Sequence, residues 1–524
     1  MEGSTKINMK SSRTINTLKN SSVSLITNFL SMAIGVLARW YFVKILGKEV
    51  LGLNGLFTNI ISMLSIVELG FGSAITYNLY KPIASNNVEE IKSLMEFYKK
   101  CYHAVAIVIM IIGILLIPFL NSIVGENQLD LNIYLIYGLF ILETASSYFL
   151  SYKRSILYAN QENFIINLCH IGYLVLMNLT QVIFLIYTKN YYIYLIIKIF
   201  FRIMENIVIN YYANKKYTYL QDKKIEKLPL NIKKDIEKKV KALFFHQTGS
   251  FIINGTDNII ISKYINLTTV GLYSNYYFII NSIQNLIRQI IKELTPSVGN
   301  LLVTESKEKA YDIFKKTRFI TFWIVTFTGI GILLVASDFV SIWLGKEYIL
   351  TFYTILVLAI NYYQKTSRMP YSIFKEAAGI FYEDRFIPII ESLINIVSSI
   401  LLVKVCGLPG VFIGTIISGL VLWLYSYPIL VYKKIFDREI KKYYFETIKY
   451  LTIFLFIMVI SIFISNLPSI NNIYIKFIYD ICISIIIPNL TMYLLFRNSE
   501  DYIYLINIAK KIINKKRNKK IDKI

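Results

Sequence analysis

Apolar residues along this chain gather into fourteen stretches of roughly membrane-spanning length, separated by short polar segments. A helix needs about 20 mainly apolar residues to cross a hydrocarbon core of roughly 30 Å, and it satisfies its own backbone hydrogen bonds there. The pattern therefore predicts an all-α integral membrane protein with about 14 transmembrane helices. The tenth stretch is short and polar at its end, which leaves open a continuation toward Lys365. The predicted spans are residues 21–43, 51–79, 101–121, 131–151, 163–187, 191–212, 242–262, 268–291, 318–344, 350–364, 386–403, 409–432, 449–466 and 473–496.

Composition excludes the soluble classes. Of the 524 residues, 55% are hydrophobic and only 17% are charged, whereas soluble domains carry about 25% charged residues. The four cysteines lie far apart inside apolar stretches, which excludes a disulfide framework and a cysteine zinc site. The net charge is +23. In so apolar a chain this positive charge indicates anionic membrane lipids as partners, and we expect no nucleic acid.

Positive charge is segregated between alternate loops. With the N-terminus in the cytoplasm, the inner segments hold 46 of the 56 Lys and Arg residues, the outer loops hold 6 and the spans hold 4. Because cytoplasmic loops are enriched in Lys and Arg, we predict that both termini are cytoplasmic. The first stretch runs into Arg39 without a small-residue cleavage site, so we interpret it as a retained span. The outer loops are too short to form a domain for chemistry.

Two short motifs repeat at nearly one spacing. Ile112–Leu116 recurs as Ile330–Leu334 after 218 residues, and Gly52 recurs as Gly271 after 219. Six predicted spans separate the copies, which predicts two parallel six-helix lobes with the substrate path between them, plus two extra C-terminal helices. The predicted domains are an N-terminal lobe 1–212, a basic cytoplasmic linker 213–241, a C-terminal lobe 242–432, the extra helices 433–496 and a basic cytoplasmic tail 497–524. The tail is either an amphipathic helix on the inner leaflet or disordered chain.

Local motifs resemble those of one transporter family. Gly255–Ser262, continuing to Val270–Tyr277, is similar to the seventh and eighth spans of Wzx-type oligosaccharide-lipid flippases. These form the polysaccharide-transporter branch of the multidrug/oligosaccharidyl-lipid/polysaccharide exporter superfamily. Glu68–Gly72 and Arg202–Glu205 resemble further parts of the same group. The resemblance implies two lobes around a central cavity that opens alternately to either side. It also implies export of undecaprenyl-diphosphate-linked repeat units for capsule, O-antigen or similar polymers across the bacterial plasma (inner) membrane.

Charges inside predicted spans are candidate functional residues, because a charge at the bilayer centre costs about 2.5–3.5 kcal/mol. Arg39 lies in the first span, and the 218-residue spacing maps it onto Asp257. We predict that Arg39 binds substrate in the cavity, and that Asp257 faces Arg39 or the cavity as a gating or ion-coupling residue. The alternative is that each residue snorkels or pairs within its own lobe.

The sixth predicted span carries a charged stripe. Lys198, Arg202 and Glu205 follow the spacing i, i+4 and i+7, which places them on one face of a helix. Lys198 and Arg202 are predicted to bind the substrate diphosphate, for which Arg offers bidentate contacts and Lys a point charge. The alternative is an internal ion pair between Arg202 and Glu205.

Single carboxylates in apolar stretches are candidates for gating or for coupling to H⁺ or Na⁺. These are Glu68, Glu143 and Glu391, and the alternative for each is a structural hydrogen bond between helices. Lys476 and Asp480 are spaced as a local i, i+4 pair. The three histidines share no spacing, so we expect no metal site and no bound cofactor.

The charges and the resemblance together predict a flippase that moves a lipid-linked oligosaccharide from the inner to the outer leaflet by alternating access, and the resemblance implies that the lipid carrier is undecaprenyl diphosphate. There is no GxxxxGK[ST] loop for ATP, so the driving force has to come from elsewhere. Other polysaccharide-assembly proteins are candidate partners. The alternatives are a multidrug or cation antiporter of the same superfamily and a membrane-embedded polysaccharide-assembly enzyme. We do not expect an enzyme, because the short outer loops supply no catalytic groups.

Overall fold

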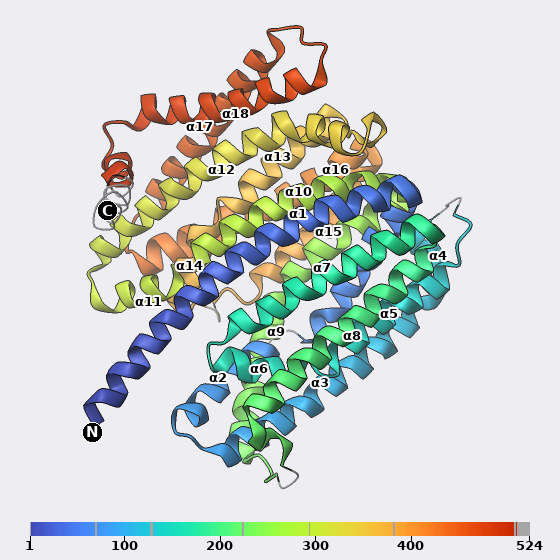
Figure 1. Ribbon diagram of the computed structural model, residues 1–524. Helices are drawn as coiled ribbons and strands as arrows, with labels where there is room; N and C mark the ends of the chain where they lie inside the picture. Colours follow the sequence, from blue (N-terminus) through green and yellow to red (C-terminus); the bar gives the residue numbers. More distant parts are fainter. Residues whose placement is uncertain are drawn as a thin grey trace, which may run out of the picture. The chain divides into compact units, whose positions relative to one another are not determined.

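All regular structure in the described part of the chain is helical. The computed structural model describes residues 2–68, 71–125, 129–222, 225–292, 294–380, 383–507 and 510, and Figure 1 shows the helices. Contacts divide the chain into two compact units, Met1–Ser274 and Asn275–Ile524. The helices of unit 1 are α1 (Glu2–Leu64), α2 (Phe71–Ala84), α3 (Val88–Leu116), α4 (Leu120–Val124), α5 (Ile133–Tyr148), α6 (Arg154–Ala159), α7 (Asn163–Thr188), α8 (Tyr191–Lys216), α9 (Leu230–Tyr264) and the start of α10 (Leu267–Lys292).

Unit 2 continues α10 and adds the remaining helices. They are α11 (Thr295–Thr304), α12 (Lys307–Trp343), α13 (Phe352–Thr366), α14 (Met369–Ala377), α15 (Ile387–Cys406), α16 (Leu408–Val421), the π-helix η6 (Leu422–Ile435), α17 (Ile440–Asn466) and α18 (Ile473–Phe496). The tenth predicted span therefore continues to Thr366, as its polar end left open. Our predicted lobe boundaries stay predictions. Helix α9, which contains the seventh predicted span, packs against α1, α2 and α4 of unit 1.

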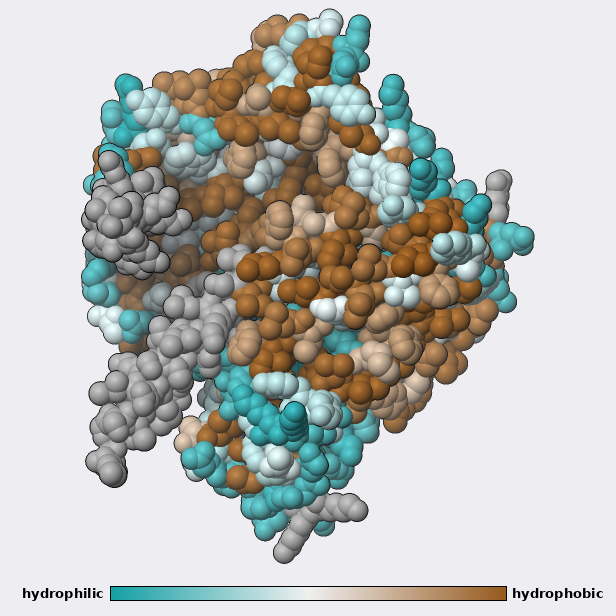
Figure 2. All heavy atoms as spheres, viewed as in Figure 1, coloured by the Kyte–Doolittle hydropathy of each residue, from teal (hydrophilic) through white to brown (hydrophobic). Residues whose placement is uncertain are grey.

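The predicted spans correspond to these helices. Nine helical stretches among the described residues are long and apolar enough to cross a membrane, and the other predicted spans form α8, α9, α10, α13 and the segment from α1 to α2. Apolar side chains stay exposed along α7, where Leu176, Leu179 and Ile183 are each more than half exposed. On the face in Figure 2, hydrophobic residues cover much of the surface and hydrophilic residues gather at its margins. The chain is therefore a multi-pass membrane protein.

Asparagine residues cap the starts of four spanning helices, of which α3 is described with the cavity below. Asn132 caps α5, Asn190 caps α8 and Asn472 caps α18, each accepting hydrogen bonds from the first backbone N–H groups of its helix. The first N–H groups of a helix have no partner within it, and a short Asn side chain supplies one. These caps allow short connections between long apolar helices, which fits the short loops that the sequence predicts at these places.

The first two predicted spans are two helices that share the label α1 and are separated by a sharp bend at a single residue. α1 runs from Glu2 to Leu64 and is broken only at Gly47, whose φ of 82° and ψ of 178° lie outside the helical region. Glycine adopts positive φ without steric cost, so it forms this bend in place of a loop. The second predicted span is divided, because α1 ends at Leu64, a 3₁₀ turn follows at Ser65–Glu68, and α2 begins at Phe71.

The repeated glycines Gly52 and Gly271 touch one another within unit 1. A Cβ atom on Gly52 would lie 2.1 Å from the Leu267 carbonyl oxygen, and one on Gly271 would lie 2.1 Å from the Lys48 carbonyl oxygen. Small residues let membrane helices approach to backbone contact. The contact holds the starts of α10 and of the second part of α1 together, and the duplication inferred from the sequence stays a prediction.

Replacing Gly52 by alanine is expected to lower the melting temperature of the purified protein. The added methyl group meets backbone atoms that cannot rotate away, and overpacking of this kind costs about 1–3 kcal/mol. The matched control is Gly172→Ala on α7, where a Cβ has nothing within 4 Å, so helix propensity alone acts and stability stays equal or rises. Equal melting temperatures for the two variants would contradict the close contact.

The beginning of the predicted tail packs against α12. Residues 500–507 are helical, the Tyr502 ring stacks on Trp323 at 5.5 Å, and the Lys316 ammonium lies over Tyr504 at 4.5 Å. This part of the tail is therefore an ordered helix packed on protein. Residues 508–509 and 511–524, which hold most of the basic end, lie outside the described residues.

Candidate functional site

A network of charged groups centres on the buried carboxylate of Glu205 in unit 1. Its side chain is 0% exposed, and its carboxylate contacts groups from three helices. Arg202, on the same helix, donates from Nη1 to Oε2 at 2.8 Å, and Arg154 of α6 places Nη2 3.3 Å from the same oxygen. His170 of α7 places Nδ1 3.0 Å from Oε1. Glu205 therefore ties α6, α7 and α8 together.

The two predicted diphosphate ligands share a second carboxylate. Lys198 Nζ lies 3.6 Å and Arg202 Nε lies 3.4 Å from the carboxylate of Glu143 on α5. Aromatic rings back both cations: the Arg202 guanidinium lies 4.9 Å from the Tyr173 ring centre, and Lys198 lies 5.3 Å from that of Phe140. The ion pair between Arg202 and Glu205, the alternative from helical spacing, is confirmed. A substrate-binding role for Lys198 and Arg202 stays a prediction.

Glu68 lies beside the same network. Its carboxylate accepts hydrogen bonds from the Tyr148 and Tyr102 hydroxyls and is within electrostatic range of Arg154. Helices α5 and α3 supply the two tyrosines. The interhelical hydrogen bond that we kept open as the alternative for Glu68 is therefore present, and its proposed part in ion coupling stays a prediction.

Arg39 and Asp257 both belong to unit 1. Arg39 Nη2 donates a hydrogen bond of 2.5 Å to Ser274 Oγ on α10, and Ser274 in turn donates to the Gly271 carbonyl at 2.8 Å. This chain of hydrogen bonds joins Arg39 to the contact between the two repeated glycines. Asp257 on α9 is buried. The predicted facing of Arg39 and Asp257 stays a prediction.

Unit 2 holds its charges in pairs of its own. Glu391 of α15 accepts from Arg368 Nη1 at 2.8 Å, and Lys476 lies 3.3 Å from Asp480 within α18, as its i, i+4 spacing predicts. Arg318 of α12 is buried and contacts Glu446 of α17 at 2.7 Å. The Arg318 guanidinium also lies 4.7 Å from the ring centre of Tyr450. Glu391 is thus a partner in an ion pair, and a part in ion coupling stays a prediction.

Sequence comparison decides the family. The family model described as "Polysaccharide biosynthesis protein" matches residues 17–299, more than half of the chain. The chain belongs to this family. A search of curated protein sequences gave no match.

Solved structures of membrane transporters resemble this chain in fold. The lipid II flippase MurJ in an inward closed conformation matches with a TM-score of 0.64 and 14% identity, covering 91% of this chain and 99% of that one. An inward-facing MATE-family multidrug resistance transporter of the MOP superfamily matches with a TM-score of 0.58 and 15% identity, covering 76% and 95%. A mutant of the Vibrio cholerae MATE transporter VcmN matches at 0.54 and 13%, covering 81% and 100%. The chain therefore has the fold of MOP-superfamily transporters, and its relatives are transporters and flippases rather than enzymes.

Two residues that contact Glu205, Arg154 and His170, were not predicted as site residues from the sequence. Arg154 counted there as a basic loop residue, and His170 carried no partner in its own helix. Both contacts cross between helices, so they depend on how each helix is rotated about its axis. One feature of the sequence could have indicated Arg154: it lies just after an apolar stretch, and from there its long side chain can extend toward a partner in a neighbouring helix. Among the described side chains, no group of three metal-ligating residues comes together.

Proposed function

We propose that this protein carries undecaprenyl-diphosphate-linked oligosaccharides from the inner to the outer leaflet of a bacterial plasma membrane by alternating access. The observation that carries the proposal is the family match over residues 17–299, together with the likeness in fold to a lipid II flippase over 91% of the chain. The lipid tail stays in the bilayer while the polar head group passes through the protein.

The residues of unit 1 suggest how a diphosphate is held. Lys198 and Arg202 share Glu143, so these three residues carry one net positive charge. An incoming diphosphate offers more negative charge and more acceptor oxygens than one carboxylate, and it competes with Glu143 for both cations. Lys198 is the more available of the two, because its one contact with a carboxylate is long at 3.6 Å, whereas Arg202 also pairs with Glu205 at 2.8 Å.

We also propose that Glu143 takes part in ion coupling, because it is the carboxylate that Lys198 and Arg202 share. Movement of Glu143 away from the two cations frees Lys198 for the diphosphate, while Arg202 stays paired with Glu205.

A multidrug antiporter has a similar fold, since MATE transporters match this chain. A cationic drug calls for an anionic or aromatic cavity, whereas Lys198 and Arg202 suit an anionic cargo. The polysaccharide family match favours the same choice.

Deleting the gene in its own bacterium tests the proposal in cells. We expect lipid-linked oligosaccharide to accumulate and surface polymer to disappear, and the wild-type gene to reverse both. Lys198→Ala is expected to restore normal protein level but little polymer, and the exposed lysine variant Lys189→Ala is the control. Unchanged polymer and no accumulation in the deletion strain would refute the proposal.

A further inference from the structure

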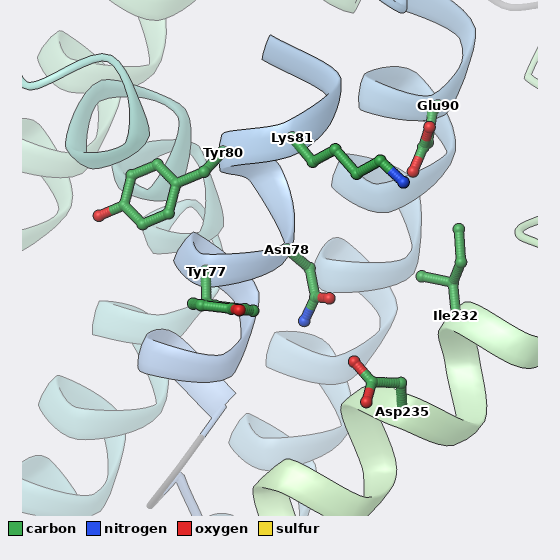
Figure 3. Close-up of a pocket in the computed structure, with 7 residues that line it drawn as sticks. All are labelled: Tyr77, Asn78, Tyr80, Lys81, Glu90, Ile232 and Asp235. Atoms are coloured by element: carbon green, nitrogen blue, oxygen red, sulfur yellow. The ribbon is translucent and has the colours of Figure 1, made fainter. Parts of the chain in front are cut away.

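A second site lies in unit 1 away from the ion pairs described above. A cavity of about 460 Å³ opens where the end of α2 meets the starts of α3 and α9, and Figure 3 shows the side chains that line it. Pockets for small ligands measure about 300–1,000 Å³, so this cavity has room for one or two sugar rings. The lining residues are Tyr77, Asn78, Tyr80, Lys81, Glu90, Ile232 and Asp235.

One side of the cavity is aromatic. Tyr77 is 62% exposed and Tyr80 is 49% exposed, and their rings meet edge to face with centres 6.5 Å apart. Exposed rings in a cavity offer flat apolar faces with a hydroxyl at the rim. The C–H face of a sugar ring has the matching shape and polarity.

The opposite side is polar and carries net negative charge. In Figure 3, Asn78 and Lys81 extend from α2, with Asp235 of α9 facing Asn78 and Glu90 of α3 facing Lys81. Two carboxylates against one ammonium repel a diphosphate, whereas they accept hydrogen bonds from neutral hydroxyl groups. The lining therefore selects a polyhydroxylated ligand over a phosphate group.

Local hydrogen bonds fix one of the two carboxylates that line the cavity. Asn87 caps α3: it accepts from the Glu90 backbone N–H at 3.2 Å, and its amide donates to Glu90 Oε2 at 3.0 Å. This pair of hydrogen bonds fixes the Glu90 carboxylate at the first turn of α3. The Glu90 carboxylate is thereby positioned at the rim of the cavity before a ligand binds.

The lining helices end on the side that the charge pattern assigns to the cytoplasm. The connection after α2 and the approach to α9 belong to the basic segments 80–100 and 213–241. A lipid-linked glycan taken from the inner leaflet presents its sugars on this side.

We infer that this cavity binds the sugar portion of the lipid-linked glycan before translocation. The inference rests on the proposed function and adds a glycan subsite separate from the cations expected to hold the diphosphate. Tyr77 and Tyr80 stack against sugar faces, and Asn78, Glu90 and Asp235 hydrogen bond to sugar hydroxyls.

The test uses the full chain in nanodiscs and saturation-transfer NMR. The probe is the oligosaccharide released by mild acid from lipid-linked precursor isolated from the source bacterium. Wild-type protein is expected to transfer saturation to the sugar C–H protons, and the double variant Tyr77→Ala with Tyr80→Ala is expected to bind at least about fivefold more weakly. Tyr77→Phe is expected to retain binding, because the ring face remains.

The control variant is Tyr187→Ala, which removes an exposed tyrosine that does not line the cavity, and it is expected to bind like the wild type. Wild-type affinity in the double variant, or no saturation transfer in the wild type, would overturn the glycan subsite. The proposed function fails by a different result, in which wild-type protein in vesicles does not translocate the intact lipid-linked glycan. The two outcomes can be told apart. If the wild-type protein translocates the lipid-linked glycan and the double variant still binds the free oligosaccharide normally, the glycan subsite is refuted and the proposed function stands.

Discussion

Replacing Glu205 by alanine is expected to destabilise the protein strongly, and by more than the methyl group added in Gly52→Ala. The Glu205 side chain is fully buried and contacts Arg154, Arg202 and His170. Without it, the two guanidinium groups remain in the protein with too little negative charge, and removing one partner of a buried ion pair costs about 3–5 kcal/mol. The melting temperature of the purified full chain in detergent measures this loss, and the protein level in membranes follows it.

The control for Glu205 is Glu237→Ala on α9. The Glu237 side chain is 52% exposed, and its contact with Lys233 is long at 3.9 Å, so its removal is expected to change stability by less than about 1 kcal/mol. Glu205→Gln is expected to fall between the two, since the amide keeps the shape and one acceptor oxygen. Equal melting of Glu205→Ala and Glu237→Ala would show that the network does not hold α6, α7 and α8 together.

Replacing Arg39 by alanine is expected to abolish transport while leaving the protein level normal, and Asp257→Ala is expected to do the same. Loss of a charge makes membrane insertion easier, because each central charge costs about 2.5–3.5 kcal/mol on insertion scales. A fall in transport therefore cannot be attributed to failed insertion. Polymer production in a strain lacking the gene, with immunoblots of membranes, measures both quantities.

Two companion variants separate the roles of Arg39. Lys44→Ala removes an exposed cation from the same helix, where it lies 4.6 Å from the Trp40 ring centre, and it is expected to transport normally. Ser274→Ala removes the hydroxyl that accepts from Arg39. If Arg39 acts mainly by positioning α10, Ser274→Ala loses transport as well, whereas a direct contact with substrate leaves Ser274→Ala largely active. Wild-type polymer in both Arg39→Ala and Asp257→Ala would remove these residues from the mechanism.

Hydropathy was sufficient to predict where the membrane-spanning helices lie, because such a helix must be long and apolar whatever packs around it. The bounds of α7 and α18 were predicted to within one residue, and the start of α8 was predicted correctly, although α8 continues past the predicted end at residue 212 to Lys216. The break in the second span was not, since it depends on a 3₁₀ turn at Ser65–Glu68 that hydropathy does not register.

Residue spacing in the sequence also predicted side-chain contacts within one helix, but it did not predict contacts between helices. The pairs Arg202 with Glu205 and Lys476 with Asp480 follow from spacings of three and four residues. The contact of His170 with Glu205 joins two helices at a rotation that sequence does not specify. The cavity beside Tyr77 likewise requires three helix ends to converge, and no motif marks them.

Translocation by the purified protein tests the central claim most directly. The protein is reconstituted into liposomes that contain lipid-linked oligosaccharide from the source bacterium in both leaflets, and a glycosidase that cannot cross the membrane is added outside. Active flipping is expected to expose nearly all of the glycan to the enzyme, and Arg39→Ala vesicles are expected to protect the inner-leaflet portion. Protection of that portion by wild-type vesicles, equal to that of protein-free liposomes, would contradict the account.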